Sequence, residues 1–386
     1  MRRWLLPLLT LVGPWCSALP AQDAAGPLAR LLQGAAVPAD ENGRLQADYL
    51  YWFLDKLAVP PLVATGPSGS QAVFGEPGTQ VLRGNGDLTS RHSRYIGVRV
   101  SGDQWLRADS PFGVNGAVTL LERDSSNLTF RDHTIVPLAR PFLDAATGQW
   151  KSLIVAGQSP QFGDLSGSIN VYSRIEFFGE DANALVRLTQ GETYRLNFLA
   201  GGHFLQMRER LKITGTSRVL PDEVVLIGVT DEFRTYNKFF GGQLGLNGQW
   251  HRGRWSLEGK GVLALGGDLQ EIRTQGDRVL HTPLARTTED FGLYVLPSNR
   301  GNFARGTVDF VTEWGLTLGW SPSPRFRARF GYSLLTWNNP VRPGDQIQPI
   351  DLSQLDSQAP PVKPSVPFRT DSFWAQGLHV GLETRW

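Results

Sequence analysis

Cysteine and long apolar runs are scarce in this sequence of 386 residues, and neither sign of charge dominates. The only cysteine is Cys16, so a chain that loses its N-terminal segment has no disulfide and no thiol chemistry. Beyond that segment no apolar run reaches about 18 residues, which excludes a bundle of membrane-spanning helices. The net charge of +2 gives no electrostatic reason to expect nucleic acid or another polyanion as a partner.

Glycine and aromatic residues, by contrast, are abundant. The chain contains 43 Gly, 12 Trp, 8 Tyr and 20 Phe, and 41% of its residues are hydrophobic. This composition alone would suggest a soluble all-β protein. The spacing of the apolar residues has to decide whether that is correct.

The first 21 residues have the layout of a secretory signal peptide. Two arginines precede a short apolar segment, and small residues follow it, so cleavage is expected after Ala18 or Ala21. One alternative is an uncleaved membrane anchor, for which the segment is too short; the other is a lipoprotein acylated at Cys16. We expect export, then a tether over residues 22–45, then one domain over residues 46–386.

Ten segments alternate apolar and polar residues with the period of two that predicts β-strands. In the clearest hairpin Phe240, Leu244 and Trp250 share one face, while Asn237 and Gln243 share the other. Many segments are long enough to cross a bilayer as tilted strands, whereas the strands of a soluble sandwich are usually shorter. The predicted strands are residues 46–54, 93–101, 113–122, 167–178, 193–205, 236–250, 255–265, 308–320, 326–334 and 373–386.

The connections between these strands alternate between long and short. Their predicted lengths are about 38, 11, 44, 14, 30, 3, 40, 4 and 35 residues. Transmembrane barrels show this pattern because one end carries extracellular loops and the other carries short periplasmic turns. We therefore predict an all-β, antiparallel transmembrane barrel of about ten strands, to which residues 208–219 could add a further strand.

Several aromatic residues lie beside the predicted short turns. Aromatic side chains are enriched at the two membrane interfaces of outer-membrane barrels, so a shared position at one end of several strands indicates a periplasmic aromatic belt. Ordinary β-core packing would explain any one of them singly. The predicted belt consists of Trp250, Trp255, Trp320, Phe326 and Trp386.

Segments spread over nearly the whole exported chain resemble a family of planctomycete outer-membrane beta-barrel proteins of uncharacterised function. The resemblance implies an outer-membrane barrel, and it implies no activity, substrate or catalytic residue. The segments that carry it are ADYLYW (47–52), PPLV (60–63), LARPF (138–142), NKFFGGQ (237–243), PSNRG (297–301), FGYSLL (330–335), RPGDQ (342–346) and FWAQGL (373–378).

The polar face of each strand would point into the barrel lumen. Arg325, Arg327 and Arg329 alternate along one strand, and Asp309 and Glu313 lie on the preceding strand, so opposite charges can pair. We predict that they form a structural plug; the alternative is a narrow solute path past an arginine-rich constriction. The other predicted members of this lumen cluster are Arg174, Glu176, Glu258, Lys260, Glu383 and Arg385.

No motif points to metal, cofactor or enzyme chemistry. The histidines lack metal-ligand spacing, and neither a phosphate-binding glycine loop nor a nucleophile elbow is found. Some ten-stranded outer-membrane barrels are proteases with Asp and His at the extracellular rim, and Asp132 with His133 could imitate part of such a site. Adjacent loop residues are far more often merely solvated, so we expect no enzyme activity and no cofactor.

These observations predict an integral outer-membrane barrel with a mostly plugged lumen and a structural or surface-interaction role. A porin-like channel and a rim-site hydrolase are the alternatives. The expected partners are outer-membrane lipids and the barrel-insertion machinery, which would recognise the C-terminal strand with its terminal aromatic residue. Long loops at one end could bind a surface ligand, but their composition does not identify one.

Overall fold

The computed structural model describes residues 42–88, 94–107, 109–131, 136–352, 363–366 and 368–386. The predicted signal peptide (1–21) lies outside these residues, as does nearly all of the predicted tether (22–45). The first strand already begins at Gly43, inside the predicted tether. Among the described residues no helix is both long enough and apolar enough to cross a membrane.

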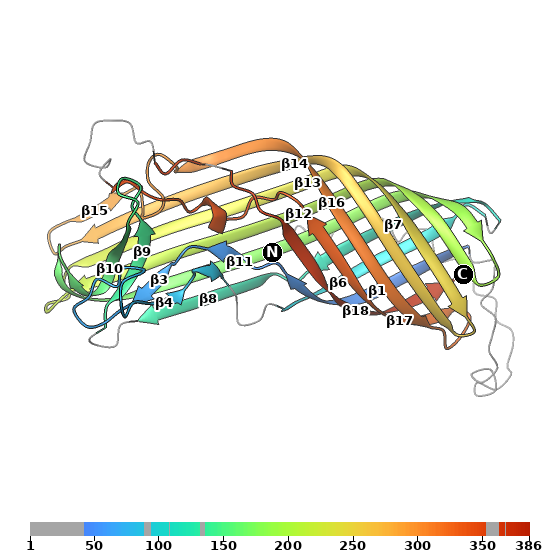
Figure 1. Ribbon diagram of the computed structural model, residues 1–386, viewed down its shortest axis with the longest axis horizontal. Coiled ribbons are helices and arrows are strands. Elements are labelled where there is room, and N and C mark those ends of the chain that lie inside the picture. Colours follow the sequence, from blue (N-terminus) through green and yellow to red (C-terminus); the bar gives the residue numbers. More distant parts are fainter. Residues whose placement is uncertain (1–41, 89–93, 108, 132–135, 353–362, 367) are drawn as a thin grey trace.

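Ten antiparallel strands form a closed ring, in which the pairing of β11 with β12 completes the circle (Figure 1). In ring order they are β1 (Gly43–Leu54), β6 (Arg94–Trp105), β7 (Phe112–Leu121), β11 (Gly163–Gln190), β12 (Tyr194–Val219), β13 (Leu226–Arg252), β14 (Trp255–His281), β16 (Gly301–Trp320), β17 (Phe326–Trp337) and β18 (Phe373–Arg385). Each predicted strand overlaps one of these elements. The prediction of an antiparallel barrel of about ten strands is confirmed.

Four adjacent strands of the ring are much longer than predicted. β11, β12, β13 and β14 have 26 to 28 residues each and extend beyond the other strands as a tall wall (Figure 1). The prediction of a long loop between β12 and β13 is wrong, because the two strands continue until a short turn at residues 220–225 connects them. Residues 208–219 therefore continue β12 and add no strand to the ring.

Short elements from the long connections complete the loop-bearing end. β8 and β10 pair with β11, and β15 pairs with β14, so these three strands extend the wall. β9, β3 and β4 follow β10 in the same sheet, and β2 pairs with β5. These elements are β2 (Ala58–Val59), β3 (Val63–Thr65), β4 (Gln80–Arg83), β5 (Gly86–Asp87), β8 (Asp124–Arg131), β9 (Leu138–Leu143), β10 (Trp150–Ser159), β15 (Arg286–Glu289) and a 3₁₀ turn, η1 (Gly344–Gln346).

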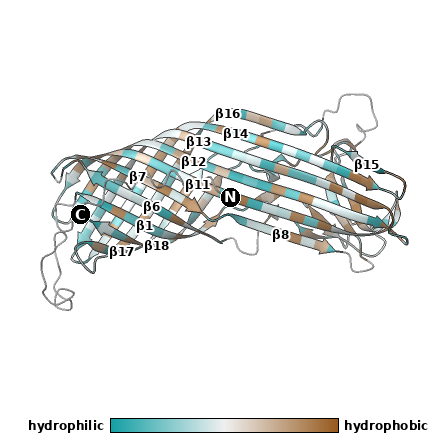
Figure 2. Cartoon of the chain, turned by 180° about the vertical axis from the view of Figure 1, so that it is seen from behind, coloured by the Kyte–Doolittle hydropathy of each residue, from teal (hydrophilic) through white to brown (hydrophobic). Residues whose placement is uncertain are grey.

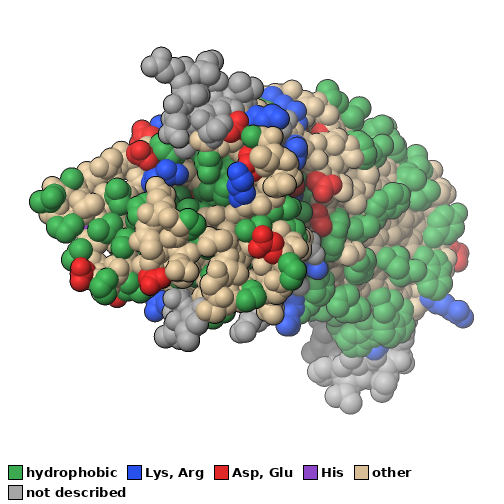
Figure 3. Space-filling model, turned by 60° about the vertical axis from the view of Figure 1, so that its left-hand side comes forward, with side chains coloured by type: hydrophobic (Ala, Val, Ile, Leu, Met, Phe, Trp, Pro, Cys, Tyr) green, Lys and Arg blue, Asp and Glu red, His purple; other side chains and the backbone are tan. Residues whose placement is uncertain are grey.

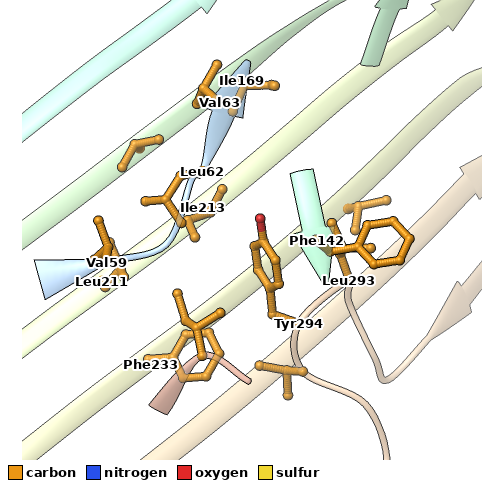
Figure 4. Packing of buried hydrophobic residues seen from close by; sticks show 14 of the residues in the cluster. Val59, Leu62, Val63, Phe142, Ile169, Leu211, Ile213, Phe233, Leu293 and Tyr294 are labelled. Carbon is orange, nitrogen blue, oxygen red and sulfur yellow. The ribbon is translucent and has the colours of Figure 1, made fainter. Parts of the chain in front are cut away.

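The loops and the wall share a hydrophobic core, here called the upper core. Leu62 and Phe142 from the connections pack with Leu211 and Phe233, which are inward-facing residues of β12 and β13 (Figure 4). All four side chains are buried. The inner face of the extended wall is therefore apolar where the folded loops pack against it, because these side chains contact loops and not water.

The outer face of the ring is also apolar. Leu244, Leu265, Leu316, Phe330 and Val380 come from five different ring strands and are each at least half exposed. Figure 3 shows hydrophobic side chains gathered over the ring, and Figure 2 shows apolar and polar residues alternating along its strands. Such a band is what a strand wall requires where it contacts hydrocarbon, and it would be costly to leave in water.

The barrel lumen as candidate functional site

Buried charges fill the lumen near the short turns, in what we call the charge layer. Glu383 of β18 is its centre: the carboxylate lies 3.2 Å from Arg327 Nη1, 2.9 Å from Arg329 Nη1 and 2.5 Å from Arg385 Nε. The Gln46 amide also donates a hydrogen bond of 2.9 Å to this carboxylate. One carboxylate thus balances several cations, which offsets the cost of removing them from water.

A second carboxylate, Glu258 of β14, extends the network across the lumen. Arg44 Nη1 lies 3.0 Å from it, Arg329 Nη1 lies 3.4 Å from it, and Asn247 Nδ2 donates a hydrogen bond of 3.0 Å. Arg329 therefore contacts both Glu258 and Glu383, and it also lies 3.2 Å from Asp48. Opposite walls of the barrel are joined through these side chains.

The third centre is Glu313 of β16, which is paired with Arg99 of β6 and lies 3.1 Å from the Lys260 ammonium. Lys260 also approaches Asp181 of β11 at 4.0 Å. The cavity left inside the charge layer has a volume of about 80 Å³, which is room for only a few water molecules. The side chains of the charge layer therefore occupy most of the lumen at this level.

Three residues of the predicted lumen cluster lie elsewhere. Arg325 is exposed in the turn before β17. Arg174 and Glu176 face outward from β11, because their apolar neighbours, among them Ile175, point inward and are buried. Asp309 does point into the barrel, but it lies nearer the loops, where it accepts a 3.0 Å hydrogen bond from a loop amide.

Five members of the charge layer escaped the sequence analysis. Asp48 and Arg99 occupy inward positions within predicted strands, so the alternation itself could have identified them. Arg44 lies in the predicted tether, and Asp181 lies where no strand was predicted. Asp103 lies just beyond the predicted end of its strand and is paired with Arg44.

An apolar layer, which we call the septum, lies between the charge layer and the loops. Trp52, Phe239 and Trp337 are almost completely buried at its centre, and the Phe239 and Trp337 ring centroids are 6.3 Å apart. All ten ring strands contribute side chains to the septum. The buried members are Leu50, Trp52, Leu54, Ile175, Phe177, Leu205, Met207, Phe239, Ala264, Val311, Leu335, Trp337, Phe373 and Ala375, and Tyr95 and Leu121 pack against them.

The connection between β17 and β18 is fixed directly above the septum by Arg342. Its guanidinium lies 2.8 Å from Glu209 on β12 and 3.3 Å from Asp55, which follows β1. Asn237 of β13 holds the adjacent Val341 by donating to its carbonyl and accepting from its amide, both at 2.8 Å. This loop is therefore bound inside the barrel mouth.

A buried ion pair joins two further connections to the wall. Arg140 Nη2 lies 2.5 Å from Asp231, and both side chains are fully buried. Asp231 also accepts backbone N–H groups of residues 293–295 at 2.7–3.1 Å. The Tyr294 hydroxyl donates to the Pro141 carbonyl at 2.7 Å, and burial raises the pKa of Tyr294 to about 12.

The five residues of the predicted aromatic belt are all exposed and lie at the short-turn end. Trp255 is directly opposite Trp320 in the β14–β16 register, and Trp250 lies across the β13–β14 turn. Phe326 begins β17, and Trp386 follows β18 at the end of the chain. Their exposed fractions range from 37% to 57%.

The described part of the chain contains no group of three or more His, Cys, Asp or Glu side chains that could hold a metal ion. The predicted rim residues Asp132 and His133 lie outside the described residues.

A closed antiparallel ring of strands with an exposed apolar outer face and a layer of paired charges inside it defines a β-barrel protein of the outer membrane. The family model "Putative beta barrel porin-7 (BBP7)" matches residues 45–386, and the chain belongs to this family.

Comparison with solved structures finds distant barrels. The outer membrane protease OmpT from Escherichia coli has a TM-score of 0.36 and 10% sequence identity, with 89% of this chain and 97% of that chain covered. The CymD monoaromatic hydrocarbon channel has a TM-score of 0.19 and 8% identity, with 94% and 93% covered. OmpT of Vibrio cholerae has a TM-score of 0.16 and 10% identity, with 91% and 100% covered. A search of curated proteins finds no match.

Proposed function

We propose that this outer-membrane barrel has a closed lumen and acts through its outer surface and its loops. The observation that carries the proposal is the septum, to which all ten ring strands contribute. Closely packed aromatic and aliphatic side chains exclude water and ions, because a hydrated ion would have to give up its hydration shell there.

Two further features support closure on either side of the septum. Below it, the carboxylates of the charge layer are paired with cations from other strands. Above it, Arg342 and Asn237 hold one loop in the barrel mouth, and Asp231 holds two more at the wall. A solute would meet three successive barriers.

The remaining parts of the proposal concern biogenesis and surroundings. The N-terminal segment directs export, the last strand with Trp386 is recognised by the insertion machinery, and lipids cover the apolar band. The protein needs no cofactor and catalyses no reaction in this account. Its structural or surface-interaction role depends on the loop-bearing end.

Solute uptake by proteoliposomes tests the closed lumen. Liposomes that contain the refolded protein should swell in small sugars or amino acids no faster than empty liposomes. The double variant Trp52→Ala and Trp337→Ala should swell faster, because it removes the largest side chains of the septum. Rapid swelling with the unaltered protein would refute the proposal.

A porin-like channel is the second candidate. The observation in its favour is the arginine-rich charge layer with its cavity of about 80 Å³, which could become a constriction if the septum moved. In that case the permeability should be selective for anions and should change when Arg329 is replaced by glutamine.

A further inference from the structure

Four arginines form a continuous row across the outer face of the extended wall. Arg174 of β11 lies directly opposite Arg210 of β12, Arg210 lies opposite Arg234 of β13, and Arg234 lies opposite Arg273 of β14. Inward neighbours such as Ile175 and Phe233 are buried, so all four arginines point away from the barrel interior. We call this feature the arginine row; Figure 1 shows its four strands side by side.

Such a row destabilises the folded barrel unless anionic groups lie close to it, because like charges directly opposite on neighbouring strands repel each other. Glu232 is paired with Arg210 and Arg234, and Glu176 is paired with Arg174. The row and the outward rows on either side of it nevertheless carry six cations and only three carboxylates. The six cations are Arg174, Arg208, Arg210, Lys212, Arg234 and Arg273. The three carboxylates are Glu176, Glu232 and Glu271.

The arginine row lies just beyond the apolar band. Phe178 on β11 and Leu269 on β14 are outward apolar residues, and each is four residues from the arginine on its strand. Four residues span about 13 Å along a strand, or about 10 Å in height for a strongly tilted one. That distance places the guanidinium groups at the level of the lipid headgroups on the loop-bearing side of the membrane.

We propose that the arginine row binds the phosphorylated headgroup of a lipid in the outer leaflet. This proposal deepens the expected contact with outer-membrane lipids and depends on the loop-bearing end being extracellular. Neighbouring strands are about 4.8 Å apart, so adjacent guanidinium groups can donate to the oxygens of one phosphate. The acyl chains of the same lipid would lie on the apolar band below.

Two tyrosines on the same face orient the arginines. The Arg210 guanidinium carbon lies 5.5 Å from the Tyr172 ring centroid, and that of Arg208 lies 5.7 Å from Tyr236. The ring contact holds the Arg210 guanidinium over the wall surface, where it is also paired with Glu232 and about a third of the side chain is exposed. A pocket of about 370 Å³ adjoins the β14 end of the row and gives space for part of a headgroup. Its lining includes Arg273, Asn302 and Arg300, and also Asp290, whose carboxylate lies 3.1 Å from Arg300.

The occupant is a lipid because the row is continuous with the lipid-facing band. A soluble anion would use only the charges, whereas a phosphorylated lipid uses the charges and the apolar surface below them together. The partly exposed position of the arginines on an outward strand face also leaves them accessible from the membrane side.

Binding to diphosphoryl lipid A in zwitterionic detergent micelles tests the proposal. The double variant Arg210→Gln and Arg234→Gln should bind this lipid at least about tenfold more weakly than the unaltered protein, because charge-assisted hydrogen bonds are lost. The matched control is Arg252→Gln with Arg286→Gln, which removes the same charge from the two ends of the wall. The control should bind like the unaltered protein.

Three results would overturn the proposal: equal loss of binding in both double variants, equal binding of a zwitterionic phosphatidylcholine, and full competition by inorganic phosphate at concentrations near that of the lipid. Folding is checked independently by heat-dependent gel mobility in lipid-free micelles, where both variants should migrate like the unaltered protein. The assay does not depend on whether the lumen conducts, so the two proposals fail separately.

Discussion

At the scale of single residues, the barrel stabilises buried charge by sharing each carboxylate among several cations. Glu383 lies within 4 Å of four arginines, and Asp231 binds one arginine and three backbone amides. Removing one partner from such a group leaves the other groups buried without compensation, which costs far more than losing a surface ion pair.

Asp231→Ala should therefore loosen two connections at once. Arg140 would remain buried without its carboxylate, and the amides of residues 293–295 would lose their acceptor, for a cost of about 3–5 kcal/mol. Amide hydrogen exchange over residues 138–143 and 291–297 should rise sharply. Glu289→Ala is the control, because its pair with Arg278 is partly exposed and should cost less than about 1 kcal/mol. Unchanged exchange in the Asp231 variant would contradict the assignment.

Asp345 should make the stability of the loop above the septum depend on pH. Burial raises the pKa of this carboxyl from 3.8 to about 6, with Arg342 opposing the rise and Asp371 adding to it. The folded loop then binds more protons than the unfolded one between pH 3.8 and about 6, so its stability falls as the pH rises through that window.

Asp345→Asn should remove this pH dependence and stabilise the loop at neutral pH. The expected gain is about 1 kcal/mol, since partial exposure reduces the effect. Protection of residues 341–347 from proteolysis, measured at pH 4.5 and pH 7.5, provides the check. If the variant kept the pH dependence of the unaltered protein, another group would be responsible.

Residue identity alone could not assign every charge to a side of the wall. Arg174 and Glu176 alternate with apolar residues just as true lumen charges do, and the pattern is the same whether the apolar face meets lipid or folded loops. The exposed position of Arg325 follows from where the turn ends, and strand boundaries are the least certain part of any sequence prediction.

At the scale of elements, the septum depends on aromatic residues that point inward from strands on opposite sides of the ring. Trp52 of β1 and Trp337 of β17 are buried to 99% or more, although lumen positions of a barrel are usually polar. Sequence alternation could not distinguish Trp52 from a lipid-facing residue, because both faces of β1 are apolar over residues 49–54.

Trp52→Ala and Trp337→Ala should each cost about 3–5 kcal/mol, the range for a large aromatic residue removed from a packed core. Heat- or denaturant-induced unfolding followed by gel mobility measures the loss. Trp314→Ala is the matched control, because this residue faces outward from β16 and is 57% exposed. Similar losses in all three variants would mean that the septum has no special role in stability.

The strands of the ring could be predicted because lipid imposes a strict alternation on them. The extension of β11 to β14 could not, since outward charges above the membrane, such as Arg208 and Lys212, resemble loop composition. Part of the sequence that was predicted to form loops therefore forms strands that continue the wall.

At the scale of the whole molecule, three features occupy the interior of the barrel: the charge layer, the septum and the bound loops. The opposite charges that are paired in the lumen contribute to the near-zero net charge. In the function that we propose, the protein acts through its outer face and its loop-bearing end, and the arginine row lies where these two surfaces meet.

Single-channel recording of the refolded protein in a planar bilayer tests the central claim, the closed lumen, most directly. The unaltered protein should insert without stable open steps, and the double variant Trp52→Ala with Trp337→Ala should show additional current. Stable, reproducible open steps from the unaltered protein would contradict the account and establish the porin-like alternative.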